Sequence, residues 1–158
     1  MARPAIPTAF DVSPQYFYLL TLADDTVLGQ IRSVQPSSSI ENTRVSRVGS
    51  STKTTLRKTK ESTLALSVWP DNDLDEVARL LGATATPTTG TEVKLAADAT
   101  AQNLQLKKYD AEALSATELE VHLLSNFLAL ELSLPVDAEG EPVLAMSGNI
   151  DDWVITKS

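Results

Sequence analysis

The stretch STLALSVW, residues 62–69, is the feature that most restricts the folds open to this chain. Leu64, Leu66 and Val68 alternate with small or polar residues, which is the period of a β-strand that buries one face. Pro70 follows directly and cannot donate a hydrogen bond to a sheet, so the strand is expected to end there. An apolar row on one side of a strand must be covered by a second layer. The chain is therefore expected to form a layered β structure.

Further strand candidates recur along the chain. Residues 16–34 are rich in aromatic and β-branched residues on both sides of Asp24 and Asp25, a turn signal, and they predict a β-hairpin. The later candidates are residues 92–96, 104–109, 119–124, 127–134, 143–146 and 152–156. This order of elements predicts a β-sandwich or barrel.

One short helix is predicted, in the stretch DNDLDEVARLLG at residues 71–82. Asp73 is the expected N-cap residue, and Gly82 stands where the helix should end. Apolar residues recur at i, i+3, i+4 and i+7, at Leu74, Val77, Ala78 and Leu81. The expected fold class is therefore mainly β, with this helix flanking the sheets.

The chain has 158 residues, which fits a single domain. Residues 1–14 contain three prolines and predict an extended N-terminal arm, followed by one β domain over residues 15–158. Residues 36–60 are polar and lack a strong period, and long stretches of this kind are usually functional or disordered loops. We expect a long loop there, between the second and third strands. A loose β-ribbon is the alternative, because Thr and Val are frequent.

The charge is distributed unevenly. The formal net charge is -8, and the sequence pI of about 4.6 argues against general binding to nucleic acid. Residues 44–60 nevertheless contain six of the 13 Lys and Arg residues and no acidic residue. These bases are Arg44, Arg47, Lys53, Arg57, Lys58 and Lys60.

Three interpretations of the basic segment are open: a solvated flexible loop, a nucleic-acid contact, or a contact with an acidic protein surface. The second is weakened because the segment has no aromatic residue for base stacking and the remaining chain is acidic. In the third, the nearest abundant acidic surface is another copy of the chain. A basic segment that meets the acidic body of an identical subunit makes a head-to-tail contact, which generates rings or open helical stacks.

No catalytic, cofactor-binding or metal site is predicted. His122 is the only histidine, and its place beside Glu120 on a strand candidate indicates a surface or half-buried strand residue. The chain has no Cys, which excludes disulfides and thiolate metal sites. No nucleotide-binding fingerprint is present, so the sequence argues against an enzyme. No apolar run approaches the roughly 18 residues that cross a membrane, and a soluble protein made in the cytosol is expected.

The order of elements resembles that of the tail tube (major tail) proteins of long-tailed bacteriophages. The matching features are YFYLLTLADDTVLGQIRSV, the polar stretch SSSIENTRVSRVGSSTKTTLRKTK, the strand STLALSVW, the helix DNDLDEVARLLG and the β-rich remainder ending in GNIDDWVITKS. The resemblance implies a β-sandwich or barrel with a flanking helix. It also implies hexameric rings whose sheets join edge to edge into an inner barrel. Such rings stack into a hollow tube that DNA passes through without specific binding.

The resemblance further implies that the segment from Pro36 to Lys60 reaches the neighbouring ring and that the lumen is negatively charged. A structural virion protein of a phage tail, made in the host cytoplasm, is the leading hypothesis. Its expected partners are copies of itself and the tape-measure, terminator and baseplate proteins. The alternatives are a single-ring tail or connector protein, or a monomeric β-sandwich binding module. The basic residues above are the expected inter-ring contacts, and the candidate acidic partners are Asp71, Asp73, Asp75 and Glu76.

Overall fold

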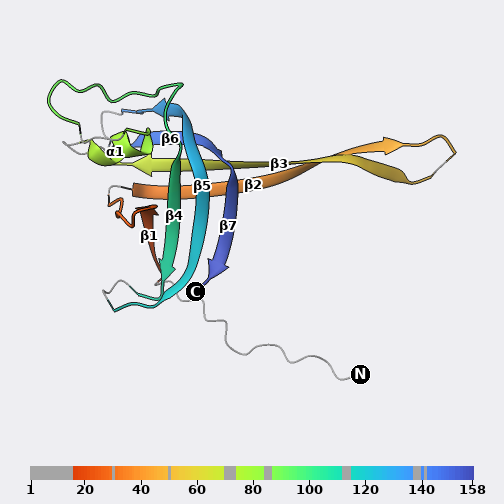
Figure 1. The fold of residues 1–158 in the computed structure, drawn as a ribbon, viewed down its shortest axis with the longest axis horizontal. Helices are drawn as coiled ribbons and strands as arrows, with labels where there is room; N and C mark the ends of the chain where they lie inside the picture. Colours follow the sequence, from red (N-terminus) through yellow and green to blue (C-terminus); the bar gives the residue numbers. More distant parts are fainter. Residues whose placement is uncertain are drawn as a thin grey trace.

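A computed structural model describes residues 16–29, 31–49, 51–69, 74–83, 87–111, 115–136, 140 and 142–158 (Figure 1). The predicted N-terminal arm, residues 1–14, lies outside the described part. The elements, in chain order, are β1 (Phe17–Leu22), β2 (Ile31–Ser46), β3 (Lys53–Val68), α1 (Asp75–Leu80), β4 (Gln102–Tyr109), β5 (Glu118–Ser133), β6 (Leu144–Ile150) and β7 (Asp152–Lys157). The chain is thus mainly β with one short helix, as the sequence predicts.

The strands form a curled, fully antiparallel sheet in the order β1-β4-β5-β6-β3-β2, with β7 also paired to β5. Strand β5 belongs to both halves of this sheet. Its first part pairs with β4 and β7, and residues 128–133 pair with β6. Between the two parts Asn126 has a φ of 53°, and its side-chain amide donates to Asp151 at 2.7 Å. This bend lets one strand serve two layers, so the two predicted strands over residues 119–134 are one continuous element.

The predicted hairpin over residues 16–34 is wrong. Strand β1 pairs with β4, whereas β2 pairs with β3. Among the described residues, the two sides of the turn are joined by an isolated bridge between Thr21 and Val27. Leu20 and Leu28 are both buried in the core, so the chain crosses here from one sheet layer to the other. The predicted strand at residues 92–96 is also wrong, because this segment has no regular structure.

The core lies between the two sheet layers. The alternation in β3 is confirmed, since Leu64, Leu66 and Val68 are at most 2% exposed. They form one cluster with Leu104 and Leu124 from the opposite layer. At about 25 cal/mol per Å² of buried apolar area, such a cluster is the main favourable contribution to folding.

Helix α1 covers one end of this core with Val77, Ala78 and Leu80. It begins after Leu74, which has a φ of 54° and makes no side-chain cap, so the prediction that Asp73 is the N-cap residue is wrong. The predicted end is confirmed: Gly82 has a φ of 89°, and a Cβ there would lie 2.6 Å from a backbone oxygen.

The polar segment between the second and third strands is a β-ribbon, the alternative that the sequence left open. Strands β2 and β3 pair along their whole length, from Ile31↔Val68 to Ser46↔Lys53, and the register shifts at two points. Only residues 62–68 of β3 also pair with β6, so the remainder projects from the body (Figure 1). Nine residues at about 3.3 Å each give a projection of roughly 30 Å. The backbone N–H and C=O groups of β2 and β3 hydrogen-bond to each other along the ribbon. This pairing does not require a buried apolar face, so the sequence of the ribbon shows no alternation of apolar residues.

Candidate assembly surfaces

The outer part of the β2–β3 ribbon, residues 37–61, carries the predicted basic residues. Cross-strand partners share a face, and Lys58 and Lys60 therefore lie on the face that continues into the core through Ser62 and Leu64. Arg57 lies on the opposite face. Beyond the register shift at Thr43/Arg44, the alternation of β2 keeps Arg44 on the face of Lys58. Four of the bases, Arg44, Lys53, Lys58 and Lys60, thus lie along one face of the ribbon, and Arg57 lies on the other.

Lys60 differs from the other bases because it is engaged within its own chain. Its ammonium group pairs with Asp152 at the start of β7, where the ribbon leaves the body. The hydrogen bond from Lys60 lowers the pKa of the Asp152 carboxyl. Within the described part of the chain, no ion pair is formed by the other five bases, Arg44, Arg47, Lys53, Arg57 and Lys58.

The ribbon also exposes apolar side chains. Val48 in the turn is fully exposed, and Leu56 and Ile40 are 66% and 63% exposed. An isolated two-stranded ribbon is marginally stable in water at best, because it has no core of its own. A projecting ribbon with exposed cations and exposed apolar residues has the features of an interaction surface.

Two of the four candidate acidic partners fall in the described part of the chain, on α1. Oδ1 of Asp75 lies 3.4 Å from Nε of Arg79, one helical turn later. Glu76 accepts a hydrogen bond of 2.7 Å from the backbone N–H of Gly29. Asp71 and Asp73 lie outside the described residues. Helix α1 and the ribbon tip occupy opposite ends of the long axis (Figure 1). The bases at the tip and the α1 acids are therefore not brought together within one chain.

The open edges of the sheet are a second feature suited to assembly. Among the described residues, strand β2 pairs only with β3, and β1 pairs only with β4. Residues 128–133 of β5 pair with β6 on one side, and no described strand pairs with their other side. A groove of about 620 Å³ runs between the open edges of β1 and β2 and is lined by apolar residues that include Leu20 and Ile31. Unpaired edges of this length are templates for another strand.

The sequence reasoning missed the outer face of the β2-β3-β6-β5 layer. On this face, which points away from the core, cross-strand partners form rows across β2, β3 and β6. Two such rows are Ser37–Thr63–Asn149 and Gln35–Ala65–Ser147. Most side chains on this face are small and uncharged, and the acids among them, Glu41, Glu61 and Glu131, are exposed. The signal was present in the sequence, because Thr63, Ala65 and Ser67 alternate with the buried leucines.

His122 is a half-buried strand residue, as predicted. Its Nδ1 accepts a hydrogen bond of 3.1 Å from the indole N–H of Trp153, and the two rings stack with centroids 5.9 Å apart. Its Nε2 lies 3.2 Å from Glu120, and this hydrogen bond lowers the pKa of the Glu120 carboxyl. The described residues contain no group of three or more potential ligands that could hold a metal ion. The contacts of His122 join β5 to β7, which is a structural role.

The described helix is too short and too polar to cross a membrane. Comparison of the sequence with models of protein families and with curated proteins gives no match.

Comparison of the fold with solved structures gives matches along nearly the whole chain. One is a chain in the sheath/tube terminator structure of an extracellular contractile injection system (PVC) in its extended state, with a TM-score of 0.61 and 12% identity over 99% of both chains. A second is in the sheath–tube complex of that system, with a TM-score of 0.60 and 14% identity over 89% of this chain and 88% of the other. The SPP1 tail tube gives a TM-score of 0.56 and 7% identity over 91% and 77%. The chain therefore has the fold of tail-tube proteins.

Proposed function

We propose that this chain is the subunit of a phage-type tail tube, which assembles into hexameric rings that stack and conduct DNA. The observation that carries the proposal is the β2–β3 ribbon. It is a basic, partly apolar extension of about 30 Å that finds little to bind on its own subunit. A body with the fold of tail-tube proteins and such an extension is suited to polymerise.

The ring would close through the open edges of the β2-β3-β6-β5 layer. Strand β2 lies at one end of this layer, and residues 128–133 of β5 lie at the other. Backbone N–H and C=O groups on these edges can pair with those of a neighbouring copy, which would extend the layer from subunit to subunit. This contact is heterologous, so it closes into a ring if the rotation between subunits allows it.

Stacking would use the ribbon of one ring against the α1 end of the next. Arg44, Arg47 and Lys53 are closest to the tip and are the bases best placed for this contact. Arg57 and Lys58 follow along the ribbon, and Lys60 supports its base through Asp152. Asp75 and Glu76 are in the first turn of α1, which lies at the end of the body that would receive the ribbon (Figure 1).

The face with Glu41, Glu61 and Glu131 would line the bore, and Arg57 on the same face would lie farther along the ribbon, toward the contact with the next ring. Small uncharged side chains offer DNA few contacts, and the exposed carboxylates repel phosphates. DNA would therefore slide along this wall without specific binding. The role is structural, without catalysis or a cofactor, in a virion tail whose other parts would be tape-measure, terminator and baseplate proteins.

A single-ring protein is the second candidate. It is favoured by the fold matches to chains in a sheath/tube terminator and in a tube-terminating cap, with TM-scores of 0.61 and 0.60. The same edges would then close one ring, and the ribbon would hold a different tail protein.

The test is to purify the protein and examine it by size-exclusion chromatography with light scattering and by negative-stain electron microscopy. We expect rings of six at low concentration and hollow tubes at higher concentration. Rings that never stack would favour the single-ring alternative. A monomer at every concentration, including conditions of low salt that strengthen charge attraction, would refute both.

A further inference from the structure

We propose that Trp69 is the anchor of the surface that receives the ribbon tip of a second copy. This inference rests on the proposed stacking and adds the residue on which the tip would land. Trp69 follows directly after β3, and it is 42% exposed. Tryptophan is rarely left exposed without reason, and it is among the residues most enriched in binding hot spots.

The position of Trp69 fits this role because β3 joins it to the ribbon tip. Strand β3 begins at Lys53, beside the tip, and ends at Val68, immediately before Trp69. Sixteen residues at about 3.3 Å separate these ends by roughly 50 Å, so a tip cannot reach the Trp69 of its own chain. Copies stacked along the direction of β3 bring the tip of one copy to the Trp69 end of the next.

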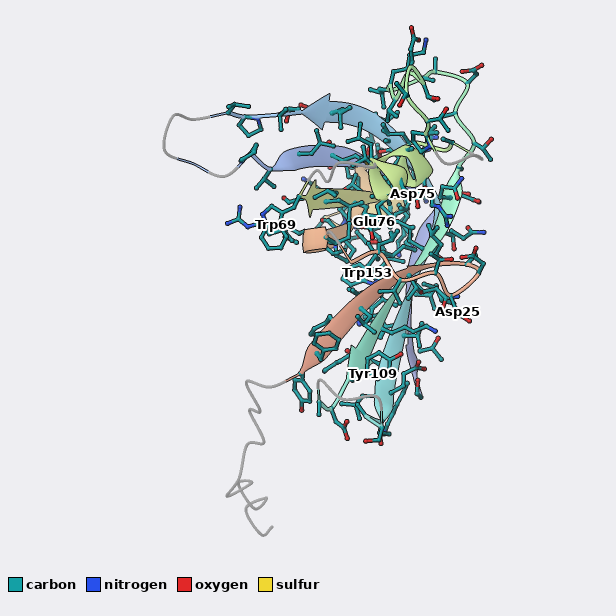
Figure 2. The ribbon with its side chains drawn as sticks, turned by 90° about the vertical axis from the view of Figure 1, so that its left-hand side faces the viewer. Asp25, Trp69, Asp75, Glu76, Tyr109 and Trp153 are labelled. Atoms are coloured by element: carbon teal, nitrogen blue, oxygen red, sulfur yellow. The ribbon has the colours of Figure 1, made fainter. Side chains whose placement is uncertain are left out.

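The chemistry of the two ends is complementary. Arg47 and the fully exposed Val48 lie in the turn at the tip, with Lys53 beside them. The receiving end presents Trp69 together with Asp75 and Glu76 (Figure 2). An indole ring can take a guanidinium over its face and an aliphatic side chain against its edge. The acids on the same end attract the cations of the tip, so the occupant is the ribbon of an identical subunit.

The first test is Trp69→Ala, with Ile155→Ala as control because Ile155 is also exposed but lies on β7. Loss of a hot spot of about 2 kcal/mol weakens each subunit contact about 30-fold, and six such contacts between hexameric rings raise the concentration needed for stacking by several orders of magnitude. Circular dichroism and thermal unfolding report whether the variants fold. Tubes from Trp69→Ala at the wild-type concentration would overturn the inference, even if the control behaved as expected.

A cross-link provides a readout that does not require loss of the anchor. The chain has no Cys, so Val48→Cys combined with Ser67→Cys places the only two thiols at the tip and close to Trp69. Treatment of tubes with a short bis-maleimide should give a ladder of covalent multimers on a denaturing gel. Val48→Cys combined with Ile155→Cys should give none.

The outcomes separate this inference from the proposed function. A ladder specific to positions 48 and 67 supports it. Tubes without that ladder would remove Trp69 as the receiving surface and leave the tube proposal standing. Wild-type protein that forms no tubes would overturn both.

Discussion

Reversal of the charge at the ribbon tip is the sharpest test of stacking. The variant Arg44→Glu/Arg47→Glu/Lys53→Glu changes three exposed residues that form no ion pair within the described part of the chain. The folding stability of the monomer should therefore fall little, since substitutions of exposed residues usually change the free energy of unfolding by no more than about 0.5 kcal/mol each. The unfolding midpoint in urea should change only slightly.

The effect on stacking should be much larger. An exposed ion pair contributes about 0.2–1 kcal/mol, so three pairs contribute about 0.6–3 kcal/mol to each subunit contact. Reversal replaces attraction by repulsion of similar size, which gives about 1–6 kcal/mol per contact. With six contacts between hexameric rings, even the lower figure weakens stacking by roughly four orders of magnitude. Rings should form and tubes should not.

The assay is sedimentation of tubes with negative-stain microscopy over a series of salt concentrations. Wild-type stacking should weaken as salt rises, because the Debye length falls from about 10 Å at 0.1 M to about 3 Å at 1 M. The control reverses Lys94 and Lys157, which lie outside β2 and β3, and it lowers the net charge by four against six for the tip variant. Tubes of the tip variant at the wild-type concentration, or loss of tubes in the control alone, would refute the reasoning.

Three further predictions concern the scaffold that positions these surfaces. Gly148→Ala should destabilise the fold by about 3 kcal/mol or more in urea unfolding, because a Cβ there would lie 2.0 Å from a carbonyl oxygen of β5. Trp153→Phe removes the donor to His122 and should lower the free energy of unfolding by about 1 kcal/mol. Lys60→Met should raise the pKa of Asp152 toward its ordinary 3.8 in an NMR titration. Because Lys60 lowers that pKa, the stability from the pair is present above pH 3.8 and is lost as the pH falls through the lowered pKa.

Each of these has a matched control. Gly29→Ala should be tolerated, because the nearest atom to its added Cβ is 3.8 Å away. Trp69→Phe should leave unfolding of the monomer almost unchanged, and a loss equal to that of Trp153→Phe would indicate a general effect of removing indole. Lys58→Met should not move the Asp152 pKa; an equal shift would mean that the ribbon's overall charge, and not the Lys60 contact, sets it.

Local patterns in the sequence predicted the helix and most of the core strands, but not the outer part of the ribbon, and they predicted a strand at residues 92–96 that does not form. The alternation from Thr63 to Val68 and the spacing of Val77, Ala78 and Leu81 reflect which face of an element is buried, and a residue's polarity reports that directly, whereas Leu74, also predicted on the apolar face, precedes the helix and is exposed. The half-buried place of His122 followed from the same alternation. The basic segment could also be identified from the sequence, because its charge depends only on which residues it contains.

The tertiary structure decided which strands pair and where the charges lie. Turn signals at Asp24 and Asp25 predict a hairpin. In the structure Leu20 and Leu28 are buried between the two layers, and β2 pairs with β3 instead of β1. Lys60 has the same local pattern as the other bases, and only the approach of β7 gives it Asp152. Strand pairing and ion pairs join residues far apart in the chain, and local patterns carry no information about such distant partners. The projection of the ribbon away from α1 arises in the same way, because it follows from where β6 stops pairing with β3.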